Sequence, residues 1–163
     1  MAKRTAQVIT ASNRASNGVY ADTSGESLAS GLTALGYSLG AVVVVPDDIE
    51  KIQTAIKAAL AKEIDLIVTT GGTGISPTDV TPQATADLIE KLLPGIPEAL
   101  RAYSRANVPT SDLSRGLAGV TGKSLIINLP GSPGAVRDGL VIIERLAGHV
   151  HDQLAGQDHS PSN

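Results

Sequence analysis

Short segments rich in β-branched residues alternate with longer segments of helical periodicity along nearly the whole chain, and this alternation constrains the fold more than any other feature. The segments with strand character are residues 7–11, 38–45, 66–70 and 124–129. A helix between two such strands returns the chain to the edge where the first strand began, so successive strands run parallel. The pattern therefore predicts an α/β fold, a three-layer domain in which helices flank a mostly parallel sheet.

The segments between the predicted strands have apolar residues at intervals of three and four, as amphipathic helices do. Residues 48–61 form one such segment. Thr81 is expected to cap a helix of about three turns, with Pro82 in the first helical position and a buried face that continues to Leu92. The last helix is expected to begin near Gly134 and to close the core.

The length of 163 residues suits one domain with a single core. We assign residues 1–155 to this domain. Residues 156–163 are polar and lack apolar periodicity, so they are expected to form a disordered tail.

Composition and charge argue against several classes of function. The net charge of −3 attracts no polyanion, and three tyrosines without phenylalanine or tryptophan leave few rings for base stacking, so nucleic acid is not an expected partner. The absence of cysteine excludes disulfides and thiolate chemistry. No apolar run approaches the roughly 20 residues of a membrane span, and none suits a signal peptide. The expected location is the cytoplasm, without membrane contact.

Polar residues and glycines follow each predicted strand directly. The carboxyl ends of parallel strands share one edge of the sheet, and ligands bind there, where helix N-termini also point. The segments concerned are residues 12–14, 46–48, 71–79 and 130–134. All four are therefore predicted to meet at one edge of the sheet.

The loop 71–79 begins with the run GGTG, from Gly71 to Gly74, between a strand and a helix. Backbone amides in such a turn are not obstructed by side chains and are free to bind an anion such as phosphate. The run is not a Walker loop, because no Lys-Ser/Thr pair follows, and the G-x-G-x-x-G fingerprint is also absent. A plain tight turn is the alternative, but the length of the loop and the presence of Asp79 favour a ligand site.

A second glycine turn, PGSPG, runs from Pro130 to Gly134 and joins the last strand to the last helix. The hydroxyl of Ser132 and the nearby amides are placed to hold a second anion. Ser132 serves equally well as the N-cap of the helix. This turn alone leaves both interpretations open, and the two turns together favour a ligand with phosphate groups.

Charged side chains accompany these turns. Asp47 and Asp48 precede a helix, where one of them is expected to be a cap. The other, with Asp79, is a candidate pair for Mg²⁺, which proteins bind through one or two carboxylates together with substrate phosphates. Arg14 is a weak candidate for neutralising phosphate charge. His151, on the last helix, is expected at the surface.

Two motifs resemble those of the molybdopterin-binding Mog/MoaB family. They are TTGGTGISPTDVTPQAT at residues 69–85 and NLPGSPGAV from Asn128 onward. The resemblance extends to SNRASNGVYADTSG at residues 12–25 and to the step from Pro46 to Asp47, in the expected order. It therefore covers nearly the whole chain.

This resemblance implies a role for each segment. In the adenylating members of the family two aspartates handle the metal and the nucleotide, and by motif position they correspond to Asp47 and Asp79, the implied catalytic and Mg²⁺-holding residues. The glycine turns would hold phosphate groups and the pterin. The residues predicted to bind phosphate, pterin or nucleotide are Ser12, Arg14, Gly71, Gly72, Thr73, Gly74, Asn128, Pro130, Gly131 and Ser132.

The implied activity belongs to molybdenum cofactor biosynthesis: molybdopterin takes AMP from MgATP, and pyrophosphate is released. The attacking phosphate oxygen is already anionic at about pH 7, so alignment and charge neutralisation matter more than a general base. A homotrimer and a downstream molybdenum-insertion protein are implied as well.

Two other functions remain open. One is a non-catalytic molybdopterin carrier or scaffold of the MoaB type, and the other is a different nucleotide-handling enzyme, because a fold alone does not fix function. Retention of both Asp47 and Asp79 favours the adenylating enzyme.

Overall fold

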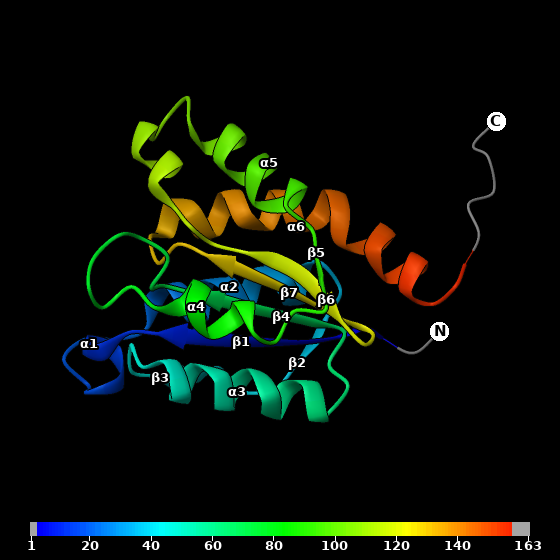
Figure 1. Cartoon of the computed structure of the whole chain (residues 1–163), viewed down its shortest axis with the longest axis horizontal. Coiled ribbons are helices and arrows are strands. Elements are labelled where there is room, and N and C mark those ends of the chain that lie inside the picture. The colour runs from blue at the N-terminus through cyan, green and yellow to red at the C-terminus, as the bar shows by residue number, and fades with distance from the viewer. Residues whose placement is uncertain (1–2, 158–163) are drawn as a thin grey trace.

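A seven-stranded sheet forms the middle layer of the computed structural model, which describes residues 3–157 (Figure 1). The strands are β1 (Thr5–Ala11), β2 (Ser38–Leu39), β3 (Val43–Val45), β4 (Leu66–Thr70), β5 (Lys91–Leu92), β6 (Ala118–Thr121) and β7 (Ser124–Leu129). The helices are α1 (Asn13–Ser16), α2 (Thr23–Ala34), α3 (Ile49–Ala61), α4 (Thr81–Ala86), α5 (Gly95–Ser104), the 3-10 helix η1 (Pro109–Leu113) and α6 (Pro133–Leu154). Figure 1 shows α5 and α6 on one side of the sheet and α3 on the other, so the predicted three-layer α/β architecture is confirmed.

The sheet is mostly parallel, as predicted. The strand order is β2-β1-β4-β7-β6-β5, and β3 also pairs with β1. The strands β1 to β4 and β7 are parallel, whereas β6 is antiparallel to β7 and β5 is antiparallel to β6. Thr70 pairs with Thr10 on one side and Leu129 on the other, and Ala11 pairs with Val45. The four polar loops therefore leave the sheet at one common edge, which confirms their predicted meeting place.

Side chains of the central strands alternate between two halves of the core. On β4, Leu66 and Val68 pack with residues of α2, α5 and α6, whereas Ile67 packs with residues of α3 and α4. All three side chains are fully buried. Strands that are buried on both faces read as continuous apolar runs, which explains why β4 and β7 have the predicted bounds.

The segment 38–45, predicted as one strand, forms the two short strands β2 and β3. The pairing partners advance from Ala6 to Ile9 on β1 but from Leu39 to Val43 on the edge, so the edge accommodates one additional residue. The side-chain amide of Gln7 donates to the carbonyl of Ala41 between the two strands, at 2.9 Å. The interruption is thus a bulge-like break at the edge of the sheet.

The helix predicted from Thr81 is shorter than expected and is capped differently. It ends at Ala86, and its N-cap is Val80, which makes no side-chain capping bond. Thr81 instead donates its hydroxyl to the carbonyl of Gly71 at 3.0 Å. The chain then enters β5, where Leu92 is 61% exposed rather than on a buried helical face. The pairing of β5 with β6, distant in sequence, overrides the local helical periodicity here.

His151 is buried, so its predicted position at the surface is wrong. The Tyr37 hydroxyl lies 3.0 Å from its Nε2 atom, and this polar partner makes burial of the imidazole possible. Burial lowers the pKa of His151, and the nearby charge of Arg4 lowers it further.

Helix α6 ends at Leu154, and Gly156 follows with a φ of 71°. The amide of Gln157 donates to the carbonyl of Asp152 at 3.0 Å, which closes the end of the helix. Residues 158–163 of the predicted tail lie outside the described residues. Between residues 3 and 157, no helix has the length and hydropathy needed to cross a membrane.

Candidate functional site

The two glycine turns touch each other at the carboxyl edge of the sheet. The amide of Gly71 donates to the carbonyl of Leu129 at 3.0 Å, and the Thr70 hydroxyl donates to the Pro130 carbonyl at 3.2 Å. A Cβ atom on Gly131 would stand 3.2 Å from the Cα atom of Gly71, which is tight. Segments far apart in the sequence are thus brought into backbone contact.

The first turn needs glycine for two reasons. Gly71 and Gly72 have φ values of 96° and 67°, in the left-handed region that side chains disfavour. In addition, a Cβ atom on Gly71 would come within 2.4 Å of the Ala11 carbonyl oxygen. This backbone conformation is therefore closed to almost every other residue.

Arg115, which precedes β6, holds the loop after the first turn in place. Its backbone amide donates to the Thr73 carbonyl at 2.8 Å, and its guanidinium donates to the carbonyls of Gly74 and Asp79, both at 2.7 Å. Three carbonyls of one loop are thereby fixed by a single residue. Arg115 was not predicted as a site residue, because nothing in the local sequence distinguishes it from a solvated arginine.

The two predicted catalytic aspartates lie against this turn. The Oδ1 atom of Asp47 is 3.4 Å from the position that a Cβ atom on Gly72 would take, and Oδ2 of Asp79 is 2.7 Å from the corresponding position on Gly74. Burial raises the pKa of Asp47, and the charge of Asp79 raises it further, whereas the hydrogen bond from Asn13 lowers it. The structure therefore brings Asp47, Asp79 and the GGTG turn together.

The hydrogen bonds of Asp47, Asp48 and Asp79 show which carboxylate caps a helix and which two lie at the glycine turn. Oδ2 of Asp47 accepts the Asn13 amide at 3.0 Å, while Oδ1 of Asn13 accepts the Asp47 amide at 2.9 Å. Oδ2 of Asp79 accepts the Ser76 amide at 2.9 Å. Asp48 caps α3 by accepting the Lys51 amide, so one member of the Asp47-Asp48 pair is the expected cap.

The side chains present fit a Mg²⁺ ion that is bound mainly through phosphate oxygens. Asp47 and Asp79 are close enough for the charge of one to raise the pKa of the other, which is the electrostatic setting that a divalent cation relieves. Within residues 3–157, no group of three or more His, Asp or Glu side chains is arranged to hold a metal ion. The two carboxylates would therefore share the ion with its substrate.

A cavity of about 360 Å³ opens between the two turns and the helices α5, η1 and α6. The predicted site residues on its walls are Gly71, Gly72, Thr73, Gly74, Asp79, Asn128, Pro130, Gly131 and Ser132. The side chain of Asn128 is engaged inside the protein, with hydrogen bonds to Thr69, Thr85 and the Leu117 amide. Ser132 caps α6 by accepting the Ala135 amide, so its capping role is realised.

A second cavity of about 350 Å³ shares Gly71 and Gly131 with the first. Ser12 lies on its wall and also caps α1. Asp22, which sequence analysis missed, lies there too and accepts the hydroxyl of Thr10 at 2.7 Å. Arg14 and Asp47 are on the wall of neither cavity. Asp47 nevertheless lies against the GGTG turn, whereas Arg14 is exposed and makes no side-chain contact with the other predicted residues among the hydrogen bonds and ion pairs of residues 3–157.

The family of this chain follows from comparison with known proteins. The model of the family described as "Probable molybdopterin binding domain" matches residues 7–147. The chain belongs to this family. A Helicobacter pylori (strain J99) relative named molybdopterin adenylyltransferase is 44% identical over 154 residues, which cover 91% of this chain and 86% of the relative. The Escherichia coli K12 protein of the same name is 34% identical, over 88% of this chain and 75% of that protein.

Solved structures of the molybdopterin-binding family have the same fold over nearly the whole chain. The molybdopterin biosynthesis Mog protein from Mycobacterium ulcerans is 47% identical, with a TM-score of 0.88 over 93% of this chain and 99% of that one. The molybdopterin biosynthesis enzyme MoaB from Thermus thermophilus is 34% identical, with a TM-score of 0.87 over 95% and 98%. The resemblance inferred from the two glycine motifs is therefore confirmed.

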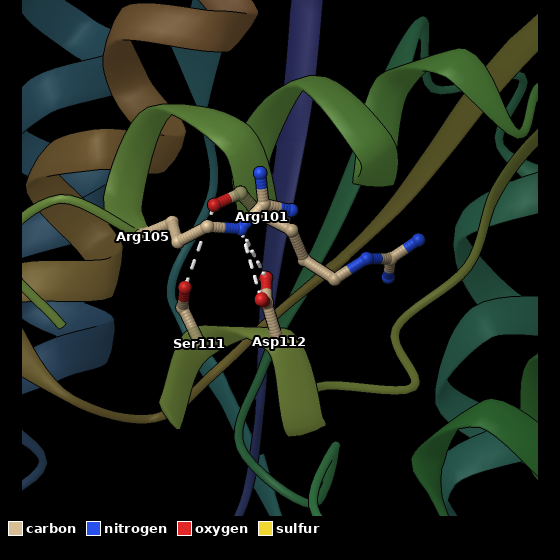
Figure 2. A network of polar contacts seen from close by, with 4 residues as sticks. All are labelled: Arg101, Arg105, Ser111 and Asp112. Atoms are coloured by element: carbon tan, nitrogen blue, oxygen red, sulfur yellow. Dashed lines mark hydrogen bonds and ion pairs between the residues drawn. The ribbon is translucent and has the colours of Figure 1, made fainter. Parts of the chain in front are cut away.

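Further polar residues of this molybdopterin-binding domain reach the first of these two cavities from α5 and α6. This cavity, which lies between the glycine turns and the helices α5, η1 and α6, is termed the larger cavity. Arg101, Ser104 and Asp138 lie on its wall. Figure 2 shows how α5 and η1 are joined beside the cavity: Arg105 pairs with Asp112 at 2.8 Å, and the guanidinium of Arg101 extends away from this ion pair. These residues could not be predicted from the sequence, because polar side chains on an amphipathic helix are expected to face solvent.

Proposed function

We propose that this chain transfers AMP from MgATP to the phosphate of molybdopterin, and so acts as a molybdopterin adenylyltransferase in molybdenum cofactor biosynthesis. The observation that carries the proposal is the placement of Asp47 and Asp79 against the GGTG turn, at the edge where the second glycine turn also lies. Relatives that bear this name at 44% and 34% identity support it.

The proposed reaction requires mainly that the attacking phosphate oxygen be aligned with the α-phosphate of ATP. The nucleophile is a phosphate oxygen that is anionic at about pH 7, and its reaction with the α-phosphate of ATP is limited by approach and by charge repulsion. The amides of Gly72, Thr73 and Gly74 in the first turn, and of Gly131 and Ser132 in the second, would bind and orient phosphate oxygens. Asp47 and Asp79 would hold Mg²⁺, which supplies charge neutralisation at the phosphates.

The arrangement of the two cavities supports a reaction between two substrates. Both cavities reach Gly71 and Gly131, so ligands bound one in each would approach one another at the turns. Ser12 would act from the side of the second cavity, and Asn128 would support the wall of the first through its internal hydrogen bonds. Arg14, which is on the wall of neither cavity, would reach the phosphates only from the exposed surface beside Ser12. These roles are part of the proposal.

The cellular setting is also part of the proposal. We expect residues 1–155 to form the molybdopterin-binding domain of a cytoplasmic homotrimer that passes its product to a molybdenum-insertion protein. The family resemblance supports this setting, and light scattering of the purified protein would measure the trimer.

The deciding experiment is an AMP-transfer assay with MgATP and molybdopterin that measures pyrophosphate release and adenylylated pterin. The wild type should form both products, and Asp79→Asn should bind molybdopterin but form neither. Asp48→Asn is a matched control, because asparagine is also a good N-cap and this carboxylate faces the helix rather than the turn. Tight pterin binding without product by the wild type would instead identify the carrier function of the MoaB type.

A further inference from the structure

The larger cavity has walls of two chemical kinds. The glycine turns offer backbone amides, which suit anions. The opposite wall, formed by α5, η1 and α6, carries the carboxylate of Asp138 and the guanidinium of Arg101, with apolar side chains such as Leu100 and Val108 beside them. A carboxylate repels phosphate unless a cation lies between them, and Asp138 lies across the cavity from the Asp47-Asp79 pair, so this wall is suited to a different part of a ligand.

Asp138 is held in a fixed orientation but its charge is not neutralised. Its Oδ2 atom accepts the hydroxyl of Ser104, on the neighbouring helix α5, at 2.5 Å, and Ser104 is only 5% exposed. Nothing in residues 3–157 forms an ion pair with Asp138.

The cations on α5 are already engaged elsewhere. Arg105 is paired with Asp112 of η1, as Figure 2 shows. The Nη1 atom of Arg101 donates to the carbonyl of Ser114 at 3.1 Å. The carboxylate of Asp138 is therefore left to accept N–H donors from a ligand in the cavity.

The apolar residues of this wall indicate the shape of that ligand. Val108 and Leu113 line the cavity and are 47% and 54% exposed, which is high for side chains of this kind. A flat heterocycle would cover them and remove apolar surface from water. Ligand sites commonly combine such apolar walls with a few fixed polar groups that decide orientation.

We propose that Asp138 is a specificity-determining residue that accepts the amino-pyrimidinone edge of the pterin, with Ser104 as its positioning residue. The assignment rests on the proposed function, which makes molybdopterin the ligand. This edge of the pterin ring presents the N3–H and the 2-amino N–H side by side, and two parallel N–H donors match the two oxygens of a carboxylate. Oδ2 retains a second lone pair for this bond while it accepts Ser104. The phosphate end of the ligand then points to the glycine turns.

Two synthetic probes test this assignment without any catalytic step. One is a pterin with a phosphomethyl group at C6, and the other is the matching lumazine, in which an oxygen replaces the 2-amino group. Binding is measured by the fluorescence of the probes. The wild type should bind the lumazine about 10-fold to 100-fold more weakly than the pterin, because an acceptor then faces the carboxylate.

Variants at the carboxylate should remove this preference. Asp138→Asn presents one donor and one acceptor, so the ratio of the two dissociation constants should fall close to 1. Ser104→Ala, which leaves the carboxylate but frees its orientation, should give an intermediate ratio. Glu144→Gln is the control, because this exposed carboxylate lies on the same helix but outside the larger cavity, and it should keep the wild-type ratio.

The possible outcomes distinguish this inference from the proposed function. A wild type that binds both probes equally, or binds neither, overturns the role of Asp138, and so does a preference that survives Asp138→Asn. A wild type that prefers the pterin through Asp138 but forms no adenylylated product supports the inference and contradicts the adenylyltransferase.

Discussion

Replacing Asn128 with alanine should destabilise the protein strongly, although this residue lies on the wall of a ligand cavity. The side chain is 2% exposed, and its amide nitrogen donates to the hydroxyls of Thr69 at 2.9 Å and Thr85 at 3.0 Å. Its oxygen accepts the Leu117 amide at 3.0 Å. The side chain thus joins β4, α4 and the segment before β6.

The loss of these three hydrogen bonds sets the size of the effect. At about 1 kcal/mol for each bond, Asn128→Ala should lower the free energy of unfolding by about 3 kcal/mol. For a domain of this size that corresponds to a decrease in melting temperature of roughly 6–12 °C. Urea denaturation and calorimetry measure both quantities.

Two further variants sharpen the test. Asn128→Asp keeps the acceptor for Leu117 but places a second oxygen opposite two hydroxyls, and the Thr85 hydroxyl already donates to the Thr81 carbonyl at 2.8 Å. It should be at least as destabilised near neutral pH and recover in part as the carboxyl is protonated. Asn107→Ala, at an exposed position, is the control. A loss below about 1 kcal/mol for Asn128→Ala would refute the inference that these bonds hold the wall together.

Three other substitutions test particular contacts. Gly71→Ala should lower the free energy of unfolding by about 1–3 kcal/mol and abolish AMP transfer, because Gly71 has a positive φ and its added Cβ atom would meet the Ala11 carbonyl. Gly18→Ala is the control and should retain activity, because Gly18 also has a positive φ, of 70°, but has open space around it. Because burial lowers the pKa of His151, the unfolded chain binds the proton more readily, and stability should fall as the pH drops below about 6.5. Urea midpoints between about pH 5 and pH 8 should show this step in the wild type, and a His151→Gln variant with an unchanged step would contradict it. The raised pKa of Asp47 has the opposite sign: ionisation of this carboxyl costs folding free energy, so thermal melts at neutral pH should show Asp47→Asn to be at least as stable as the wild type. A less stable Asp47→Asn would show that the bond from Asn13 outweighs burial.

The parts of the fold that the sequence predicted are those in which local pattern and tertiary environment agree. Strands β4 and β7 are buried on both faces, so their apolar runs mark their bounds. Strands β5 and β6 were missed because β5 has two residues and β6 contains a glycine, so they are defined by antiparallel pairing, of β5 with β6 and of β6 with β7. Thr81 was misjudged as a cap because its hydroxyl binds Gly71, ten positions earlier in the chain.

The candidate site divides in the same way. The glycine turns and Asp47 and Asp79 follow strands directly, so the rule for parallel sheets locates them from the sequence. Arg115 and Asp138 reach the site from outside those loops. Arg115 bonds to Gly74, which is 41 positions away in the sequence, and Asp138 bonds to Ser104, which is 34 positions away. No local sequence pattern predicts such contacts. His151 was misplaced for the same reason, because its partner Tyr37 is far away in the sequence.

The three carbonyls held by Arg115 make the glycine loop and the segment before β6 one cooperative unit. Neither segment can open without breaking these bonds, so their amides should exchange with solvent deuterium with similar protection. The floor and one wall of the larger cavity would then loosen together. A ligand that spans both would suppress this opening, and its binding should therefore be detectable as slower exchange at Thr73 and Arg115 even in the absence of turnover.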